Sequence, residues 1–314
     1  MSKRYILLLA TLGFAALVNA AAPLSKTLPP GVFRMMLGEF EVTALSDGTV
    51  DLPVNQLLTN TTQKHVDSVL AKSFLKSPLE TSVNAYLVNT GAKLVMIDAG
   101  AGTLFGPTLG KLQAALKAAG YTPEQVDEIY ITHMHPDHVG GLSASGVIAF
   151  PNAVVRADKH DADYWLSAVE MEKAPKDAKG FFAGAQASLT PYVQAGKFNP
   201  FEGDTALVPG IKAVASHGHT AGHVTYVVES GGQKLVLWGD LMHVAAVQFA
   251  EPSVTIKFDS DSKTAAAQRK KAYAEAAKQG YWVAAAHLPF PGIGHIRAEG
   301  KGFAWIPLNY GAPR

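Results

Sequence analysis

The sequence predicts an α/β protein in which two mixed sheets pack face to face between outer layers of helices. One observation favours this four-layer αββα arrangement, and the composition is compatible with it. The chain divides into two halves, and in each half strands are followed by helices. Its 314 residues are 48% hydrophobic and 17% charged, which describes a soluble globular chain with a large core, as one large domain or two small ones.

The first half begins with a strand at residues 39–45, where apolar and polar side chains alternate, and a turn at 46–48. Strands at 83–88 and 93–97 flank a hairpin turn at 89–91. The remaining predicted elements are a helix at 107–119 ended by Gly120, a short helix opened by a capping box at 122–125, and a buried strand at 128–132.

The second half repeats this order. Its predicted elements are a strand at 154–157, a helix at 158–169, strands at 211–215, 224–229 and 234–238, a helix at 262–279 ended by Gly280, and a final core strand at 281–286. The segment 170–204 contains several aromatic residues and prolines, so we expect an irregular, cap-like insertion there.

The first twenty residues predict a secretory signal peptide. Lys3 and Arg4 give a positive start, residues 6–18 are mostly apolar, and small residues at 18–20 fit a cleavage site. The apolar run is shorter than the roughly 18 residues that a membrane-spanning helix needs. An uncleaved anchor or a buried helix is the alternative. We expect a mature domain at 21–314 that is periplasmic or secreted and has no stable membrane anchor after cleavage.

The composition excludes several kinds of site and partner. Because the chain has no Cys, it forms no disulfide and no thiolate metal site. The formal net charge is +1 and falls by two, to −1, when Lys3 and Arg4 are removed. The one other basic cluster is residues 269–271 on a predicted helix, so nucleic acid is not an expected partner.

The strongest chemical signal is the run His133-Met134-His135-Pro136-Asp137-His138, which follows the buried strand at 128–132. Zn²⁺ accepts imidazole nitrogens and carboxylate oxygens, and crowding them together is costly unless something binds them. The run therefore predicts a metal site, with a solvated histidine-rich loop as the alternative.

Three further strand ends carry histidine or aspartate. They are the loop 216–223, which contains His219, and the positions of Asp240 and His287. Taken singly, Asp240 is typical of a turn and His287 of a core histidine. Together with the first run, they predict one site where the strands end.

The chain resembles the metallo-β-lactamase superfamily of binuclear hydrolases, whose seven metal ligands are matched in order by His133, His135, Asp137, His138, His219, Asp240 and His287. The resemblance runs from about Gly38 to the C-terminus. Residues 128–132 and 291–296 look like the methyl parathion hydrolase branch, which includes exported homodimers that hydrolyse aryl organophosphates and relatives that open lactones. The resemblance implies the metallo-β-lactamase fold and a homodimer.

The resemblance also implies roles for these residues. One cation would be held by His133, His135 and His219, the other by Asp137, His138 and His287, with Asp240 as the bridge. We expect two Zn²⁺ per chain, with Mn²⁺, Co²⁺ or Fe²⁺ as alternatives at the second site. Two cations about 3.5–4 Å apart lower the pKa of a shared water toward about 7 and stabilise the developing oxyanion. Asp98 would orient a ligand imidazole.

Apolar side chains are the expected pocket walls. These are Phe105, Trp165, Phe181 and Phe182 in loops or the cap and, by the resemblance, Leu58, Ile256 and Phe258. A core position is the alternative for each aromatic ring. Together they favour a flat apolar substrate such as an aryl ester or aromatic lactone. The sequence near the motifs contains no Lys or Arg group that would indicate a clamp for an anionic phosphate or a β-lactam carboxylate.

His243 departs from the methyl parathion hydrolase pattern, which has an apolar residue three positions after the bridging aspartate and an Arg where Leu58 stands here. As a second catalytic residue beside Asp240, His243 would donate a hydrogen bond to a lactone carbonyl and leave less room for a phosphotriester. Its alternative role is to support Asp240. We therefore expect a zinc-dependent hydrolase of aromatic lactones of the dihydrocoumarin type, with phosphotriester hydrolysis as the alternative.

Two other classes are disfavoured. Diiron redox relatives carry a carboxylate in place of His135. A nuclease would need a basic face, which the net charge and the small basic cluster do not provide.

Overall fold

The computed structural model describes residue 22 and residues 24–313. The predicted signal peptide, residues 1–20, lies outside the described residues. Within the described part of the chain, none of the helices combines the length and the apolar character needed to cross a bilayer.

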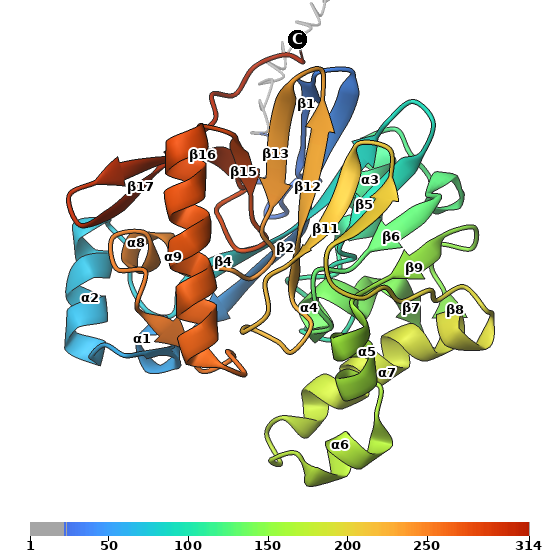
Figure 1. Cartoon of the computed structure of the whole chain (residues 1–314), viewed down its shortest axis with the longest axis horizontal. Coiled ribbons are helices and arrows are strands. Elements are labelled where there is room, and N and C mark those ends of the chain that lie inside the picture. The colour runs from blue at the N-terminus through green and yellow to red at the C-terminus, as the bar shows by residue number, and fades with distance from the viewer. Residues whose placement is uncertain (1–21, 23, 314) are drawn as a thin grey trace, which may run out of the picture.

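Two large sheets form the centre of the fold (Figure 1). The first has the strand order β1 (Val32–Leu37), β2 (Phe40–Leu52), β4 (Leu79–Asn89), β5 (Leu94–Ile97), β6 (Glu128–Tyr130) and β9 (Val154–Arg156). The second has the order β10 (Thr205–Val208), β11 (Ile211–Ala215), β12 (Val224–Ser230), β13 (Gln233–Leu237), β15 (Trp282–Ala284), β16 (Ile293–Glu299) and β17 (Gly302–Pro307). Both sheets are mixed, since β5, β6 and β9 run parallel, as do β13 and β15.

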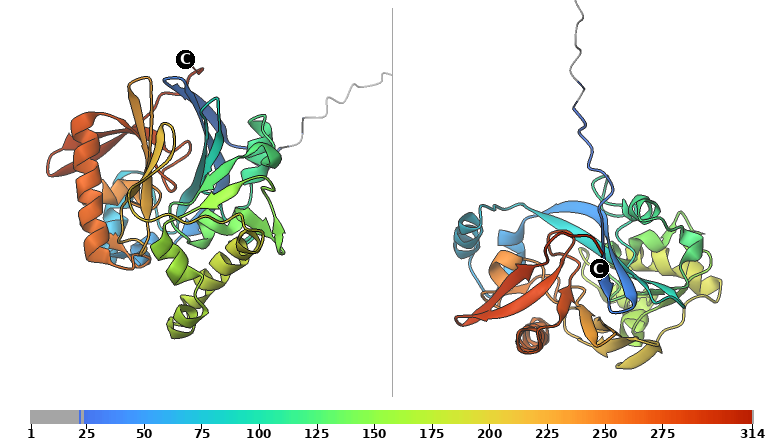
Figure 2. Two further views of the ribbon diagram at one scale, coloured as in Figure 1. Left: turned by 45° about the vertical axis from the view of Figure 1, so that its right-hand side comes forward. Right: turned by 90° about the horizontal axis from the view of Figure 1, so that it is seen from above.

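The layers follow from the three main groups of buried side chains. One group lies between the sheets and includes Tyr86, Tyr130 and Tyr226; the rings of Tyr130 and Tyr226 stack at 5.6 Å. A second group packs the outer face of the first sheet against α3 (Leu112–Ala118), α5 (Lys159–Trp165) and α7 (Lys179–Gln194). A third packs the second sheet against α9 (Ser262–Gln279) (Figure 2). The predicted αββα fold class is confirmed.

The remaining elements connect or cover these layers. They are the helices α1 (Val54–Leu57), α2 (Gln63–Lys72), α4 (Pro136–Val139), α6 (Ala168–Lys173) and α8 (Ala245–Gln248), the 3-10 turns η1 (Pro123–Gln125) and η2 (Gly140–Leu142), and the short strand pairs β3 (Leu58–Thr59) with β14 (Thr255–Ile256) and β7 (Ser143–Ala144) with β8 (Val147–Ile148).

The helix α9 has the bounds that the sequence predicts. Asp261 caps its start by accepting hydrogen bonds from the backbone N–H of Thr264 at 3.0 Å and from the Thr264 hydroxyl at 2.6 Å. Gly280 ends the helix with a left-handed φ of 69°, which favours glycine. Local sequence signals decide both ends of this helix.

The prediction of a turn at 46–48 is wrong. The strand β2 continues through it to Leu52 and pairs with β4, with a register shift between Ser46 and Gly48. Asp47 leaves the ladder there and accepts hydrogen bonds at 2.9–3.0 Å from three backbone N–H groups within residues 101–112. The Ser-Asp-Gly run therefore marks a β-bulge and not a chain reversal.

The segment 170–204, predicted to be irregular, is largely helical, because α6 and α7 lie within it or overlap it. The apolar face of α7, which includes Phe182, packs into the outer core. Pro191 lies in the last turn of α7, where it lacks the N–H that would bond the carbonyl of Ala187. The Ser143 hydroxyl donates to that carbonyl at 2.9 Å, which explains how the helix accommodates its proline.

Other differences from the prediction concern two helices and the edge of the second sheet. The helix expected from residue 107 begins at Leu112. The helix expected at 158–169 is divided, because Ser167 starts α6 by accepting a hydrogen bond from the N–H of Glu170 at 3.2 Å. The strand near 281–286 is not the last, since β16 and β17 extend the same sheet beyond it.

Candidate functional site

The predicted ligand residues gather along one edge of the two sheets, where strands end. They come from the segment 133–138 after β6, the β11–β12 loop with His219, and the ends of β13 and β15 with Asp240 and His287. The first segment follows a strand of the first sheet and the others follow strands of the second. The site is therefore assembled from both halves of the chain.

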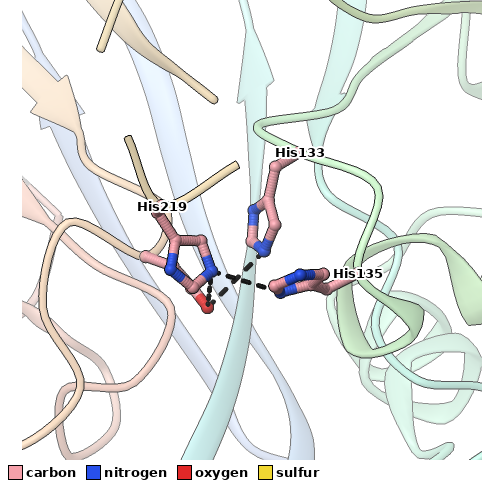
Figure 3. A group of neighbouring side chains, drawn as sticks. His133, His135 and His219 are labelled. Atoms are coloured by element: carbon pink, nitrogen blue, oxygen red, sulfur yellow. Dashed lines mark hydrogen bonds and ion pairs between the residues drawn. The ribbon is translucent and has the colours of Figure 1, made fainter. Parts of the chain in front are cut away.

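His133, His135 and His219 direct their ring nitrogens toward one another (Figure 3). Nδ1 of His135 lies 3.1 Å from Nε2 of His219. Oδ2 of Asp240 lies 3.4 Å from Nε2 of His219 and 3.6 Å from Nε2 of His133. All four side chains are buried.

Asp137, His138 and His287 form a second group beside the first. Oδ2 of Asp137 lies 3.6 Å from Nε2 of His138 and 3.5 Å from Nε2 of His287. Asp240 also faces this group, with Oδ1 3.1 Å from Nε2 of His138 and Oδ2 3.1 Å from Nε2 of His287. Asp240 thus lies between the two groups, where the predicted bridge would be.

The spacing of these atoms fits divalent cations. Metal–ligand bonds of about 2.0–2.1 Å in a tetrahedron place neighbouring ligand atoms about 3.3 Å apart, and the distances above lie between 3.1 and 3.6 Å. Nε2 of His133, Nε2 of His138 and Oδ1 of Asp240 are buried and make no hydrogen bond of acceptable geometry with any described residue. Because such atoms are costly to bury, both groups are suited to hold metal.

Asp98 lies where the sequence places it, behind a ligand imidazole. Its Oδ2 accepts hydrogen bonds from Nδ1 of His138 at 2.8 Å and from the hydroxyl of Thr132 at 2.9 Å. Its Oδ1 accepts the backbone N–H of Thr132 at 2.8 Å. The carboxylate therefore fixes the orientation of the His138 ring and leaves Nε2 facing the site.

Two similar supports were missed by the sequence analysis. Oδ1 of Asp259 lies 2.9 Å from Nδ1 of His219, and the carbonyl oxygen of Ser82 accepts Nδ1 of His287 at 2.9 Å. Asp259 stands just before the cap of α9, and nothing in its local sequence distinguishes it from an ordinary turn residue. A backbone carbonyl carries no sequence signal.

Asp161 is a third unpredicted support, and it links the two histidine-rich loops. This buried carboxylate accepts hydrogen bonds from the N–H of Met134 at 2.8 Å, the hydroxyl of Thr220 at 3.0 Å and the N–H of Gly222 at 2.6 Å. Met134 lies between His133 and His135, and Thr220 adjoins His219. One side chain of α5 therefore holds both loops in place.

Burial and mutual contact shift the pKa values of the site. Burial lowers the pKa of His133 and His135 well below the usual value. Burial would raise the pKa of Asp240, but His138 and the other neighbouring imidazoles outweigh it and hold the pKa well below the usual range. Burial opposes protonation of His219, yet its bonds to Asp240 and Asp259 raise its pKa to about 9. Cation binding here would therefore displace protons.

A cavity opens onto this cluster. Its lining includes four residues that the sequence suggests as pocket residues, Phe105, Phe181, Phe258 and His243, beside Asp137, Asp240, His135 and His287. Three further wall residues, Val50, Leu52 and Leu109, were not predicted from the sequence. Nothing in their sequence separates a cavity wall from a core position.

Four residues expected at the pocket do not line the cavity. Leu58 and Ile256 pair across β3 and β14 and lie in a small separate core with α2. Trp165 packs edge-on against His135, with ring centroids 5.2 Å apart, and so lies behind a ligand. The expectations for Leu58 and Ile256 are wrong because strand pairing turns both side chains into that core. Phe182 is likewise a core residue.

His243 both lines the cavity and contacts Asp240. Its Nε2 lies 3.0 Å from Oδ2 of Asp240, and its ring stacks on that of His287 at 5.1 Å. The side chain of Gln248 fixes this segment by accepting the backbone N–H of His243 at 2.8 Å. The geometry therefore accommodates both roles that the sequence leaves open.

Other histidines have hydrogen-bonding partners of their own. Nδ1 of His223 donates to the carbonyl of Ser216 at 3.1 Å, and its Nε2 accepts the backbone N–H of Asp240 at 3.1 Å. Burial lowers the pKa of His223 to about 3. His65 contacts Glu251 at 2.7 Å.

The basic cluster predicted at 269–271 is smaller than it looks in the sequence. Arg269 is buried and donates to the carbonyls of Leu241, Pro252 and Val254 at 2.6–3.2 Å. It also lies 3.8 Å from Asp259. This arginine holds the segment before α9 and contributes nothing to a surface charge.

Solved structures resemble the chain over most of its length. The hydrolase AbOPH, described as being in the beta lactamase superfamily, is 38% identical with a TM-score of 0.86, over 91% of this chain and 100% of that one. AidC, described as a dizinc quorum-quenching lactonase in complex with a product, is 26% identical with a TM-score of 0.84, over 90% of this chain and 99% of that one.

Curated proteins match over a shorter stretch. An N-acyl homoserine lactonase of Bacillus cereus is 26% identical over 161 residues, which are 51% of this chain and 56% of that protein. The chain thus spans about half the length of this curated relative. The family model described as Metallo-beta-lactamase superfamily matches residues 79–279. That match covers more than half of the sequence and includes six of the seven predicted ligands, and so the chain belongs to the metallo-beta-lactamase superfamily.

Proposed function

We propose that this protein is a metal-dependent hydrolase that opens lactones bearing an apolar aryl group, of which dihydrocoumarin is the type. The observation that carries the proposal is the cavity, whose aromatic and aliphatic walls end at Asp137, Asp240 and His287. Among the described residues that line it there is no Lys or Arg. Such a cavity suits a neutral, flat, apolar ester better than an anionic substrate.

The two groups of ligand residues would hold the metal. His133, His135 and His219 would bind one cation and Asp137, His138 and His287 the other, with Asp240 shared. Two Zn²⁺, or other divalent ions at the second position, supply Lewis acidity and lower the pKa of a coordinated water. The chain's own contribution is to fix the ligand rings through Asp98, Asp259 and the Ser82 carbonyl.

His243 is the residue best placed to act on the carbonyl. In lactone hydrolysis a water oxygen adds to the carbonyl carbon, the ring C–O bond breaks, and the freed oxygen takes a proton to give a hydroxy acid. In either protonation state the His243 ring has at least one N–H, and it borders the cavity. A hydrogen bond to the developing oxyanion would contribute about 2–4 kcal/mol in a water-excluded site. Phe105, Phe181 and Phe258 would hold the aryl ring.

N-acyl homoserine lactones are the second candidate substrate class. They share the neutral lactone ring, and the names of the Bacillus cereus relative and of AidC refer to this chemistry. Their acyl chains are apolar and would occupy the same aromatic-walled cavity.

The test is a substrate panel combined with His243→Leu. Dihydrocoumarin, an N-hexanoyl homoserine lactone and a neutral aryl phosphotriester are compared with metal-loaded enzyme. The substitution removes the hydrogen-bond donor and adds apolar surface, so kcat/KM should fall for lactones and rise for the phosphotriester. His65→Leu, at an exposed histidine outside the cavity, should leave all three unchanged. Equal losses on every substrate would show that His243 only supports Asp240, and a phosphotriester preference in the unmodified enzyme would refute the proposal.

We also propose that the protein is exported and dimeric. The support is the pattern of Lys3, Arg4 and the apolar run at 6–18, and the resemblance to a branch of exported homodimers. N-terminal sequencing of mature protein should begin near Ala21, and light scattering should give twice the chain mass. A start at Met1 in a cytoplasmic fraction would refute export, and a monomer would refute the dimer.

A further inference from the structure

A third group of metal-type ligands lies outside the Asp240 site. Asp158, His160 and His217 each offer one ligand atom, and these atoms lie within 4.8 Å of one another. Asp158 caps the start of α5, His160 lies in the first turn of that helix, and His217 belongs to the β11–β12 loop. The proposed hydrolase function uses none of the three.

The carboxylate of Asp158 has one imidazole on each side. Its Oδ1 lies 2.8 Å from Nδ1 of His160, and its Oδ2 lies 3.8 Å from Nε2 of His217. The two imidazole rings are 5.1 Å apart between centroids. The first contact is a hydrogen bond. Because neighbouring ligand atoms of a tetrahedral zinc site lie about 3.3 Å apart, a cation bound here would lengthen the first distance and shorten the second.

The His217 nitrogen supplies an independent observation. Its Nε2 is buried and makes no hydrogen bond with any of the described residues, although it faces the fully buried carboxylate of Asp158. At 3.8 Å the two atoms are too far apart for a direct hydrogen bond. A buried nitrogen beside a buried carboxylate is costly unless something binds between them.

The carboxylate itself is held in place. The backbone N–H groups of His160 and Gly203 donate to it at 2.8 and 3.1 Å. The loop and α5 also meet closely here, since a Cβ on Gly222 would lie 2.9 Å from Oδ1 of Asp158. The His160 side chain, by contrast, is 49% exposed, which leaves one side of the group open to water as a fourth ligand.

We infer that Asp158, His160 and His217 bind a divalent transition-metal cation, with Zn²⁺ matching the donor set of two imidazoles and one carboxylate. This site is separate from the Asp240 site. It would join the start of α5 to the loop that carries His219. Because Asp161 on the same helix already links both histidine-rich loops, a cation here would stabilise that junction from its outer side.

The test counts bound zinc by equilibrium dialysis in zinc-buffered solution and elemental analysis of the full-length mature protein. The unmodified protein should bind one equivalent of zinc more than His160→Ala or His217→Gln. The variant that combines both substitutions should bind no fewer equivalents than either single variant. His65→Ala, a matched histidine of similar exposure, should bind as the unmodified protein does. Added Zn²⁺ should raise the Tm of the unmodified protein more than that of the two variants.

Disabling the Asp240 site separates the two centres. In Asp240→Asn the extra equivalent should persist and should still be lost when His160→Ala is added. The inference is overturned if both His160→Ala and His217→Gln bind zinc with the stoichiometry and affinity of the unmodified protein, or if the equivalent lost in them is lost equally in His65→Ala. Neither readout depends on turnover, so failure of the hydrolase proposal would leave this result intact.

Discussion

Replacing Asp161 by Asn should loosen both histidine-rich loops at once. The two oxygens of Asp161 accept three hydrogen bonds, from the N–H groups of Met134 and Gly222 and from the hydroxyl of Thr220. Asn has almost the same shape but only one acceptor oxygen. The hydroxyl of Thr220 can rotate to accept from the new amide, whereas one backbone N–H must face an NH₂ group.

The size of the effect follows from that count. One buried N–H without a hydrogen-bond acceptor costs about 1–3 kcal/mol. The remaining hydrogen bonds also become weaker, because their acceptor is no longer charged. Burial raises the pKa of Asp161 despite its three donors, which means that burial destabilises the ionised carboxylate. Removing the charge therefore offsets part of the loss in unfolding free energy. We expect a net loss of about 1–3 kcal/mol of unfolding free energy, or about 2–10 °C in Tm for a chain of this size.

Denaturant unfolding of the metal-free protein measures this loss directly. Asp163→Asn is the matched control, since Asp163 lies on the same helix, is 64% exposed in its side chain and pairs with Lys159 at the surface; its effect should stay within about 0.5 kcal/mol. Metal affinity of Asp161→Asn should fall as well, because both loops carry ligands. If Asp161→Asn unfolds like Asp163→Asn and binds metal normally, the three hydrogen bonds do not hold the loops.

Three further outcomes are expected. A chelator should lower the Tm, and added Zn²⁺ should restore it, because buried ligand atoms of His133, His138 and Asp240 would lose their partner; an unchanged Tm would contradict the metal assignment. Asp98→Asn should weaken metal affinity by about 10- to 100-fold in a chelator competition, and a normal affinity would show that the His138 ring needs no support. Hydrogen bonds from Thr264 lower the pKa of Asp261 below its ordinary value of 3.8, so its stabilisation is present above that pH and is lost as the pH falls through the lower folded value. The Tm difference between Asp261→Ala and unmodified protein should therefore shrink between about pH 6 and about pH 3, and a constant difference would refute the capping role.

Local signals account for what the sequence predicts well. The ends of α9 depend on Asp261 and Gly280, which act within one helical turn. The ligand positions could be predicted because imidazoles and carboxylates at successive strand ends form an unusual pattern, and strand ends share one edge of a sheet. The resemblance implies that Asp98 orients a ligand imidazole, but that this imidazole is His138 appears only in the structure.

What the sequence could not predict depends on contacts between distant segments. Ile256 and Phe258 stand two positions apart, are both apolar and belong to the same small core, yet Ile256 is buried in it beside Leu58 while Phe258 packs at its margin and also borders the cavity. No property of either residue reveals which surface it meets. Asp259 acts on a loop 40 positions away in the chain, and Asp161 on loops 27 and 61 positions away, so their roles appear only once the layers are packed.

Asp240 lies between ligands from both sheets, and this position bears on how the chain folds. The four ligands at 133–138 are synthesised together, whereas His287 arrives only when the second sheet is nearly complete. A half-folded chain therefore offers an incomplete set of donors, and tight cation capture must follow the docking of the two sheets. Once bound, the ions would tie residues 133 and 287 together across a long stretch of chain, as a cross-link does. In a sequence without Cys, the covalent counterpart of that cross-link is absent, so resistance to unfolding should depend on the supply of metal and be indifferent to reductants.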